Sequence, residues 1–237
     1  MIQQTLEHIY GLSSGFKALL YPPICLFCQN PIDSHKWRQF CQTCSQHFER
    51  VDPSHRCPSC FAEACQTCHT RPRLTRRTLA AFDYEENARR LLDVFKAGNR
   101  SYLAEGMGAL MALQWLEQGM PFPDLIIPVP SSPLKTFQRS YNPSLLLAHT
   151  VSKLLKRPLW RGLQKELTYL SQSDKSDPDR LKLPPNNIFL SKDPSPLRDK
   201  HLLLIDDILV SGQTLHLSAS RLLEGYPRTI DALVFAR

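Results

Sequence analysis

Apolar and polar positions alternate in blocks along the C-terminal two thirds of the chain, and these blocks predict strands and helices in turn. Short apolar runs bounded by polar residues are typical of buried strands. Longer stretches with apolar residues three or four positions apart are typical of helices. The predicted strands cover residues 78–84, 124–130, 159–163, 201–206 and 229–236. The predicted helices cover residues 85–97, 101–118, 142–156 and 214–223.

Strands that alternate with helices favour an α/β fold with a mainly parallel sheet and helices on both of its faces. In such sheets, ligands bind beyond the carboxyl ends of the strands. We therefore expect the functional residues of this part of the chain to follow strands.

The N-terminal part differs in composition, because all eight cysteines lie within the first 68 residues. Every cysteine belongs to a Cys-x-x-Cys pair, a spacing that lets two thiolates face one metal ion. Two such pairs make the tetrahedral sulfur site that suits zinc. The pairs are Cys25/Cys28, Cys41/Cys44, Cys57/Cys60 and Cys65/Cys68. We predict a structural zinc module over residues 20–70, with all eight cysteines as metal ligands.

Two pairings of these cysteines stay open. The first two pairs are separated by twelve residues, a spacing that fits one zinc ribbon, whereas only residues 61–64 join the last two pairs. Sequential and interleaved arrangements are both compatible with these separations. A disulfide framework is the alternative, and it fits poorly with the reducing compartment that we infer.

Composition and charge bear on compartment and partners. The 237 residues are 42% hydrophobic, and no uninterrupted apolar run approaches the ~20 residues needed to cross a bilayer. The N-terminal segment lacks the features of a signal peptide, so we expect a cytoplasmic protein without a membrane span. The formal net charge of +7 favours polyanionic partners, such as nucleic acid or a phosphorylated ligand.

A basic linker joins the cysteine-rich module to the α/β domain, which we expect over residues 76–237. Its arginines are Arg71, Arg73, Arg76 and Arg77. They could form a solvated connection, contact the phosphates of single-stranded DNA, or pair with carboxylates between the two modules.

The most informative segment follows the apolar strand 201–206. Asp206 and Asp207 stand at its end, where carboxylates can accept hydrogen bonds from vicinal ribose hydroxyls. Residues 210–214 then form a short turn before a helix, where backbone amides can surround a phosphate. Gly212 allows close backbone approach, and hydroxyls add donors. The candidate loop residues are Val210, Ser211, Gly212, Gln213 and Thr214. This arrangement predicts a ribose-phosphate site.

Residues 205–214 resemble the phosphoribosyl pyrophosphate signature of type I phosphoribosyltransferases. Over residues 20–237 the chain resembles the ComF family, competence-associated proteins in which a cysteine-rich zinc module precedes such a domain. Further segments similar to that family are Phe95–Gly98, Ile127–Pro130 and Arg139–Asn142, with Gln172, Arg180 and Asn187. The chain departs from the family where Val210 and Ser211 replace two threonines and where Pro143 replaces a glutamine, and residues 173–185 have diverged. We expect these departures to preserve the phosphate site and to affect mainly catalytic turnover.

The resemblance implies phosphoribosyl pyrophosphate as ligand, bound with Mg²⁺, and basic side chains around the pyrophosphate. The candidates are Lys96, Lys135 and Arg139, with Tyr141 and Asn142 shaping the pocket and residues 170–187 as a lid. Two functions follow. In the first, the chain is a phosphoribosyltransferase whose acceptor the sequence does not identify. In the second, it is a non-catalytic adaptor that senses this ligand and binds single-stranded DNA or DNA-uptake proteins. Aromatic residues that could stack bases are sparse near the linker.

Overall fold

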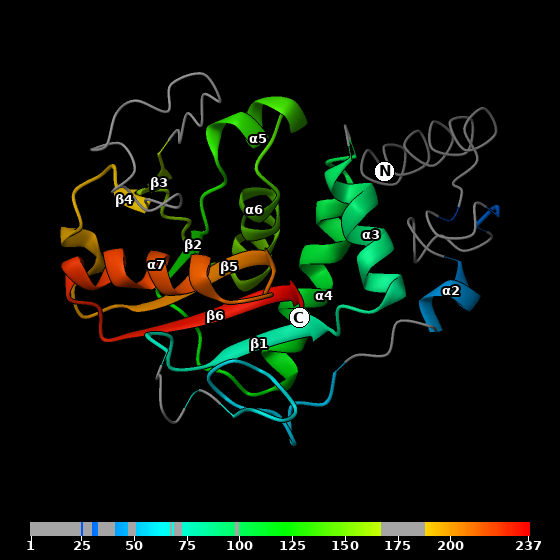
Figure 1. Ribbon diagram of the computed structural model, residues 1–237, viewed down its shortest axis with the longest axis horizontal. Coiled ribbons are helices and arrows are strands. Elements are labelled where there is room, and N and C mark those ends of the chain that lie inside the picture. Colours follow the sequence, from blue (N-terminus) through cyan, green and yellow to red (C-terminus); the bar gives the residue numbers. More distant parts are fainter. Residues whose placement is uncertain are drawn as a thin grey trace, which may run out of the picture. The chain divides into compact units, whose positions relative to one another are not determined.

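A four-stranded parallel sheet forms the centre of the computed structural model, which describes residues 25, 30–32, 41–46, 51–66, 68, 73–97, 100–166 and 188–237 (Figure 1). The strands are β1 (Thr78–Phe82), β2 (Leu125–Pro128), β5 (His201–Ile208) and β6 (Thr229–Ala236), in the order β1-β6-β5-β2. Every neighbouring pair runs parallel. The predicted α/β class is therefore confirmed, and the boundaries of these four strands agree with the sequence pattern to within a few residues.

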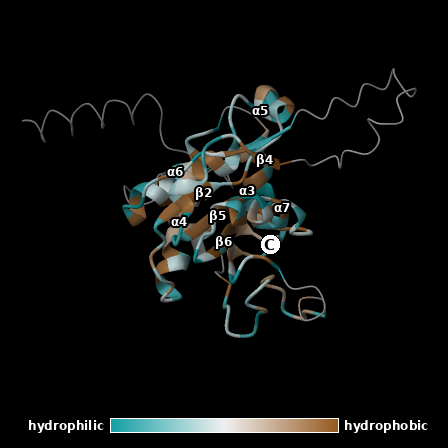
Figure 2. Cartoon of the chain, turned by 90° about the vertical axis from the view of Figure 1, so that its left-hand side faces the viewer, coloured by the Kyte–Doolittle hydropathy of each residue, from teal (hydrophilic) through white to brown (hydrophobic). Residues whose placement is uncertain are grey.

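The two central strands owe their position to continuous apolar runs. Residues 202–205 of β5 and 232–236 of β6 are fully buried. A strand that is apolar on both faces is stable only when both faces are covered, as parallel sheets require. Figure 2 shows the hydrophobic colour of these strands inside the domain.

Helices cover both faces of this sheet. α4 (Leu103–Glu117) and α6 (Pro143–Leu155) pack against one face, and α7 (Gln213–Leu222) lies on the other (Figure 1). α3 (Glu86–Lys96) precedes α4 along the chain. α4 and α6 approach closely at Gly108, where a Cβ atom would lie 2.6 Å from the Cβ of Thr150. A larger residue at position 108 would force these helices apart.

Several short elements differ from the sequence prediction. α5 (Pro133–Arg139) was not expected, and neither was the antiparallel pair β3 (Leu163–Lys165) and β4 (Ile188–Leu190). Of the predicted strand 159–163, only Leu159 pairs with β2, through one parallel bridge to Ile126, and β3 begins at residue 163. Two 3₁₀ turns, η2 (Ser195–Leu197) and η3 (Leu223–Gly225), flank β5 and α7. No helix in the described part of the chain is long and apolar enough to cross a membrane.

The chain divides into two compact units, residues 1–49 and 50–237. The first contains α2 (Gln42–Gln46). The second contains the α/β domain together with residues 51–68, because this segment hydrogen-bonds to β1. The amide of Thr78 donates to the carbonyl of Pro58 at 2.7 Å, and the amide of Val51 donates to the carbonyl of Ala81 at 3.3 Å. The last two cysteine pairs thus fold with the sheet, whereas we had expected all four pairs in one module over residues 20–70.

Candidate functional site

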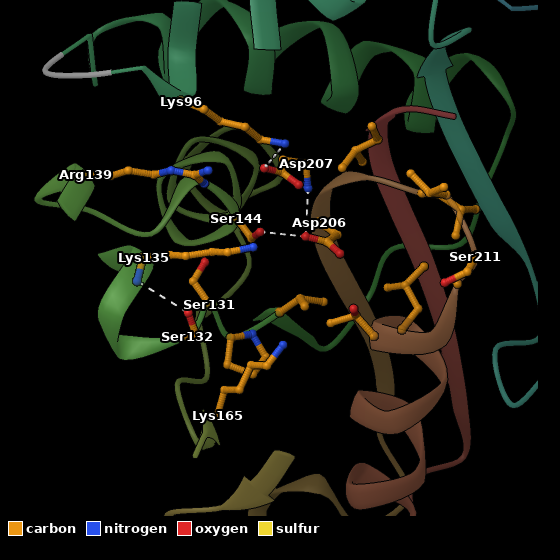
Figure 3. A pocket seen from close by; sticks show the side chains of 18 of the residues that line it. Lys96, Ser131, Ser132, Lys135, Arg139, Ser144, Lys165, Asp206, Asp207 and Ser211 are labelled. Atoms are coloured by element: carbon orange, nitrogen blue, oxygen red, sulfur yellow. Dashed lines mark hydrogen bonds and ion pairs between the residues drawn. The ribbon is translucent and has the colours of Figure 1, made fainter. Parts of the chain in front are cut away.

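A cavity of about 730 Å³ opens at the carboxyl ends of β2 and β5 (Figure 3). Its walls come from the segment that follows β2, from α5, from the start of α6 and from the loop between β5 and α7. Of the nine predicted ligand residues, eight line it: Lys135, Arg139, Asp206, Asp207, Val210, Ser211, Gly212 and Thr214. Gln213 does not. The loop and the two basic residues, which are about 70 positions apart in the sequence, therefore meet at one site.

The two acidic residues are buried and have different partners. The hydroxyl of Ser144 donates to Oδ1 of Asp206 at 2.7 Å, and the amide of Asp207 donates to the same oxygen at 2.9 Å. Asp207 instead forms an ion pair with Lys96, whose Nζ lies 2.9 Å from Oδ2. Burial, and then the nearby charge of Asp207, raise the pKa of Asp206 to about 7, although the hydrogen bond from Ser144 opposes this rise.

Four basic side chains surround the rest of the cavity. Lys96, Lys135, Arg139 and Lys165 reach toward it from elements that lie across from Ser211 (Figure 3). α5 supplies two of them, and Ser132 begins that helix by accepting the amide of Lys135 at 3.4 Å. Burial, and then the charge of Lys135, lower the pKa of Lys165. A cavity with this many cations suits a ligand with several negative charges.

The 210–214 loop includes the first two residues of α7, Gln213 and Thr214. Gly212 precedes the helix with φ +74°, a backbone conformation that favours glycine. The amides of Ser211, Gly212 and Thr214 make no hydrogen bond within the described part of the chain, whereas the amide of Gln213 donates to the hydroxyl of Ser211 at 3.3 Å. Unpaired amides at the start of a helix can bind an anion.

Asn142 and Tyr141 support the cavity from outside. The side chain of Asn142 accepts the amide of Leu145 at 3.3 Å, so it caps α6, and its Nδ2 donates to the carbonyl of Val129 at 3.2 Å. The hydroxyl of Tyr141 donates to the carbonyl of Phe95. Neither residue lines the cavity. They tie α6, α3 and the segment after β2 together.

Sequence analysis missed Ser144 and Lys165, which both line the cavity. Ser144 is the one polar residue among the first six residues of α6, and this was a usable signal. Lys165 lies on the three-residue strand β3, whose partner β4 is more than twenty positions away, so the local sequence gave no signal. The predicted lid at residues 170–187 lies outside the described residues.

The cysteines form two clusters. In the first cluster, four sulfur atoms lie within 4.8 Å of one another, those of Cys57, Cys60, Cys65 and Cys68. In the second, three sulfur atoms lie within the same distance of one another, those of Cys25, Cys41 and Cys44. Cys28 lies outside the described residues. A tetrahedral zinc site has sulfur atoms roughly 3.8 Å apart, given Zn–S bonds of about 2.3 Å. The complete cluster fits this geometry, with Cys60 Sγ and Cys65 Sγ 3.5 Å apart. The sequential pairing of the last two Cys-x-x-Cys motifs is the one observed.

Three arginines of the basic linker have side-chain partners within the protein, and Nη1 of Arg77 donates to Sδ of Met120 at 3.7 Å. Arg76 binds the fully buried Asp231, with Nε 3.1 Å from Oδ1 and Nη2 2.5 Å from Oδ2. His201 Nε2 lies 2.7 Å from the same carboxylate. Burial alone would raise the pKa of Asp231, but the hydrogen bonds from His201 and Arg76 outweigh it and lower that pKa. Arg73 donates to the carbonyl of Ser211 at 3.2 Å. Arg71 lies outside the described residues.

These contacts predict that Arg76 stabilises the fold. Arg76→Ala should lower the free energy of unfolding by roughly 1–3 kcal/mol, because it removes two charge-assisted hydrogen bonds from a buried carboxylate. Arg77→Ala is the matched control, since it removes the same charge while the backbone amide of Arg77 still donates to Asp231 at 3.0 Å. Thermal unfolding of both variants, with single-stranded DNA binding across a salt series, checks this. An equal drop in salt dependence for both variants, with unchanged melting temperatures, would instead support phosphate contact by the linker.

Comparison with known proteins links this site to a family. The model of the phosphoribosyl transferase domain matches residues 144–237. The chain is 26% identical over 230 residues to the DNA utilization protein YhgH of Shigella flexneri, covering 92% of this chain and 99% of that one. It is 25% identical over 225 residues to the competence protein ComFC of Bacillus subtilis, covering 85% and 89%. Among solved structures, the purine phosphoribosyltransferase of Pyrococcus horikoshii aligns with a TM-score of 0.35 and 17% identity, over 55% of this chain and 70% of that one.

Proposed function

We propose that this chain binds phosphoribosyl pyrophosphate with Mg²⁺ in the cavity after β5. It belongs to the ComF and YhgH family and carries a phosphoribosyltransferase domain. The observation that carries the proposal is the cavity itself. It combines a buried acidic pair, a loop with unpaired amides and four basic side chains. These are the groups that a ribose bearing one phosphate and one pyrophosphate needs.

Each group has a role in this proposal. The amides of the 210–214 loop and the hydroxyl of Thr214 bind the 5′-phosphate at the start of α7. Asp206 and Asp207 accept hydrogen bonds from the ribose hydroxyls. Ligand entry then separates Lys96 from Asp207 and turns it toward the pyrophosphate, together with Lys135, Arg139 and Lys165.

The same residues support transfer of the phosphoribosyl group to an acceptor. When pyrophosphate leaves C1 of the ribose, negative charge grows on the leaving group, and cations held around it stabilise the transition state. Mg²⁺ bound with the pyrophosphate would supply further positive charge there. Within the described residues we find no side chain that stands out as a general base, so the acceptor remains outside this proposal. The reaction class is phosphoribosyl transfer.

We also propose that the Cys57/Cys60/Cys65/Cys68 cluster and the cluster of Cys25, Cys41 and Cys44 each hold a structural zinc ion, with Cys28 completing the latter. The seven described cysteines form no disulfide with one another. Thiolates fill every position of such a site and leave no place for a water molecule, so the ion would stabilise the fold and take no part in catalysis. This use of cysteine fits the cytosol, where thiols stay reduced. The relatives' names connect the family with DNA utilization and competence, and we expect this protein to act in the same context.

Isothermal titration calorimetry of the full chain with phosphoribosyl pyrophosphate tests the ligand. We expect binding that depends on Mg²⁺ and exceeds the binding of ribose 5-phosphate, because only the larger ligand reaches the four cations. Release of pyrophosphate, measured with candidate bases and amines as acceptors, then separates a transferase from a binding protein. Equal affinity for both ligands with and without Mg²⁺ would contradict the proposed site.

A further inference from the structure

The linker residue Arg73 contacts the backbone of the 210–214 loop. Its Nη2 donates to the carbonyl oxygen of Ser211 at 3.2 Å. Its guanidinium also packs against Gly212, where an added Cβ atom would lie 1.5 Å from Nη1. Ser211 and Gly212 line the cavity, whereas Arg73 does not. The arginine therefore reaches the loop from outside the cavity.

The sheet holds the linker that carries Arg73. The amide of Arg76 donates to the carbonyl of Ile230 at 2.7 Å, and the amide of Ala232 donates to the carbonyl of Arg77 at 2.9 Å. These hydrogen bonds fix the backbone close to Arg73 along β6. The fold itself therefore limits where the side chain of Arg73 can reach.

The hydrogen bond to Ser211 sets the direction of a backbone amide. The carbonyl of Ser211 and the N–H of Gly212 belong to one planar trans peptide, so they point in opposite directions. Because Arg73 binds the carbonyl from outside the cavity, the amide of Gly212 points toward the cavity. That amide makes no hydrogen bond within the described part of the chain, so it can donate to an anion there.

The charge of Arg73 also strengthens this amide as a donor. A cationic donor on a carbonyl oxygen polarises the peptide, and the N–H of the same peptide then forms stronger hydrogen bonds. Gly212 permits the contact, because a side chain at position 212 would occupy the place of the guanidinium. The arginine orients and polarises the peptide, and the glycine leaves room for it.

We propose that Arg73 is a positioning residue for the 5′-phosphate of phosphoribosyl pyrophosphate, and that it acts through the peptide between Ser211 and Gly212. This inference rests on the proposed binding of phosphoribosyl pyrophosphate. It gives the linker a part in ligand binding. The pyrophosphate group of the ligand meets cations from other elements, so binding of that group should not depend on Arg73.

The test compares five full-length proteins: the wild type, Arg73→Ala, Arg73→Lys, Lys135→Ala and Arg89→Ala. Calorimetry with Mg²⁺ gives the affinity of each for phosphoribosyl pyrophosphate, ribose 5-phosphate and inorganic pyrophosphate. Arg89 is an exposed arginine of α3 outside the cavity, with a 3.9 Å ion pair to Asp93, so its loss controls for net charge. Melting temperatures are measured on the same samples. NMR follows the amide proton of Gly212 with and without ribose 5-phosphate.

We expect Arg73→Ala to weaken binding of ribose 5-phosphate and of phosphoribosyl pyrophosphate on the order of tenfold each, and to leave binding of inorganic pyrophosphate unchanged. Arg73→Lys should lie in between, because lysine keeps the charge and a donor. Lys135→Ala should weaken binding of inorganic pyrophosphate, and Arg89→Ala should match the wild type. Ribose 5-phosphate should shift the Gly212 amide proton of the wild type to lower field, and this shift should be smaller in Arg73→Ala.

If Arg73→Ala binds ribose 5-phosphate as tightly as the wild type does, the positioning role alone is overturned. An equal loss for all three ligands has the same meaning, because the arginine would then act through net charge. Should Arg73→Ala fail to fold, Arg73→Lys and the wild-type NMR signal decide. A Gly212 amide that does not shift when ribose 5-phosphate binds contradicts the inference. A wild type that binds neither sugar phosphate would overturn the proposed function as well.

Discussion

Gly212→Val should weaken binding of phosphoribosyl pyrophosphate by roughly 100-fold, the equivalent of two lost charge-assisted hydrogen bonds of ~1.5 kcal/mol each. Two features of Gly212 lead to this expectation. Its φ of +74° is strained for a β-branched residue, and an added Cβ would collide with Arg73. The loop must change its backbone to accommodate valine, so the amides of Ser211 and Gly212 would no longer converge on one phosphate. Calorimetry with Mg²⁺ measures the loss.

Gly119→Val provides a matched control. Gly119 has a similar φ of +58° at the end of α4, but nothing lies within 4 Å of its Cβ position, and it does not line the cavity. Both variants should lose similar stability through backbone strain, on the order of 1–2 kcal/mol. Only Gly212→Val should lose the ligand. If both variants bind phosphoribosyl pyrophosphate as the wild type does, the 210–214 loop is not the phosphate site.

Cys60→Ser should destabilise the whole α/β unit by several kcal/mol, about 3 or more, because zinc binding in such sites supplies ~10–16 kcal/mol of folding free energy. The cluster is continuous with the sheet. The carbonyl of Cys60 accepts Nε of Arg237 at 2.5 Å, and the hydroxyl of Thr78 donates to the carbonyl of Ser59 at 2.9 Å. Loss of the metal would release these contacts with β1 and the C-terminal residue. Elemental analysis and thermal unfolding measure the two effects.

Cys44→Ser distinguishes the two clusters, since Cys44 belongs to the first compact unit. We expect this variant to lose zinc while the α/β unit keeps its melting temperature, followed by circular dichroism, because most described helical residues belong to that unit. Equal destabilisation by both variants would mean that the two units do not fold separately. An unchanged zinc content in Cys60→Ser would contradict the assignment of its cluster as a metal site.

Much of the fold was predictable because it depends on local patterns. The strands at residues 202–205 and 232–236 are uninterrupted apolar runs, and Asn142 with Pro143 marks the start of α6 by cap chemistry alone. α5 was missed for the opposite reason. It has no buried residue, and its apolar residues Leu134 and Phe137 are exposed. The helix therefore lacks the core-facing stripe of apolar residues on which the sequence prediction depends.

The candidate site was predictable where its residues form one continuous segment, and the family resemblance added Lys96, Lys135 and Arg139, which line the cavity. The acidic pair and the 210–214 loop form one continuous motif, so a single segment specified them. The partners of that motif come from elsewhere: Ser144 reaches Asp206 from α6, Lys165 from β3, and Arg73 from the linker. The sequence left three roles open for Arg73 and Arg76: solvation, contact with DNA phosphates, or pairing with carboxylates. Their different partners depend on how the chain folds back on β5 and β6, which no local pattern encodes.

The segment 51–61 protects the protein against aggregation through an edge of its sheet. An end strand of a sheet exposes unpaired amides and carbonyls that can recruit a strand from another molecule. Here residues 51–61 bind the backbone of β1, and Pro158 and Trp160 bind that of β2 through Ile126, at 2.9 and 2.8 Å. Both flanks of the sheet are thus occupied by the chain itself. Because the first flank is closed by a segment that the cysteines hold, metal loss would expose β1, and the damaged molecules would tend to add to one another edge to edge.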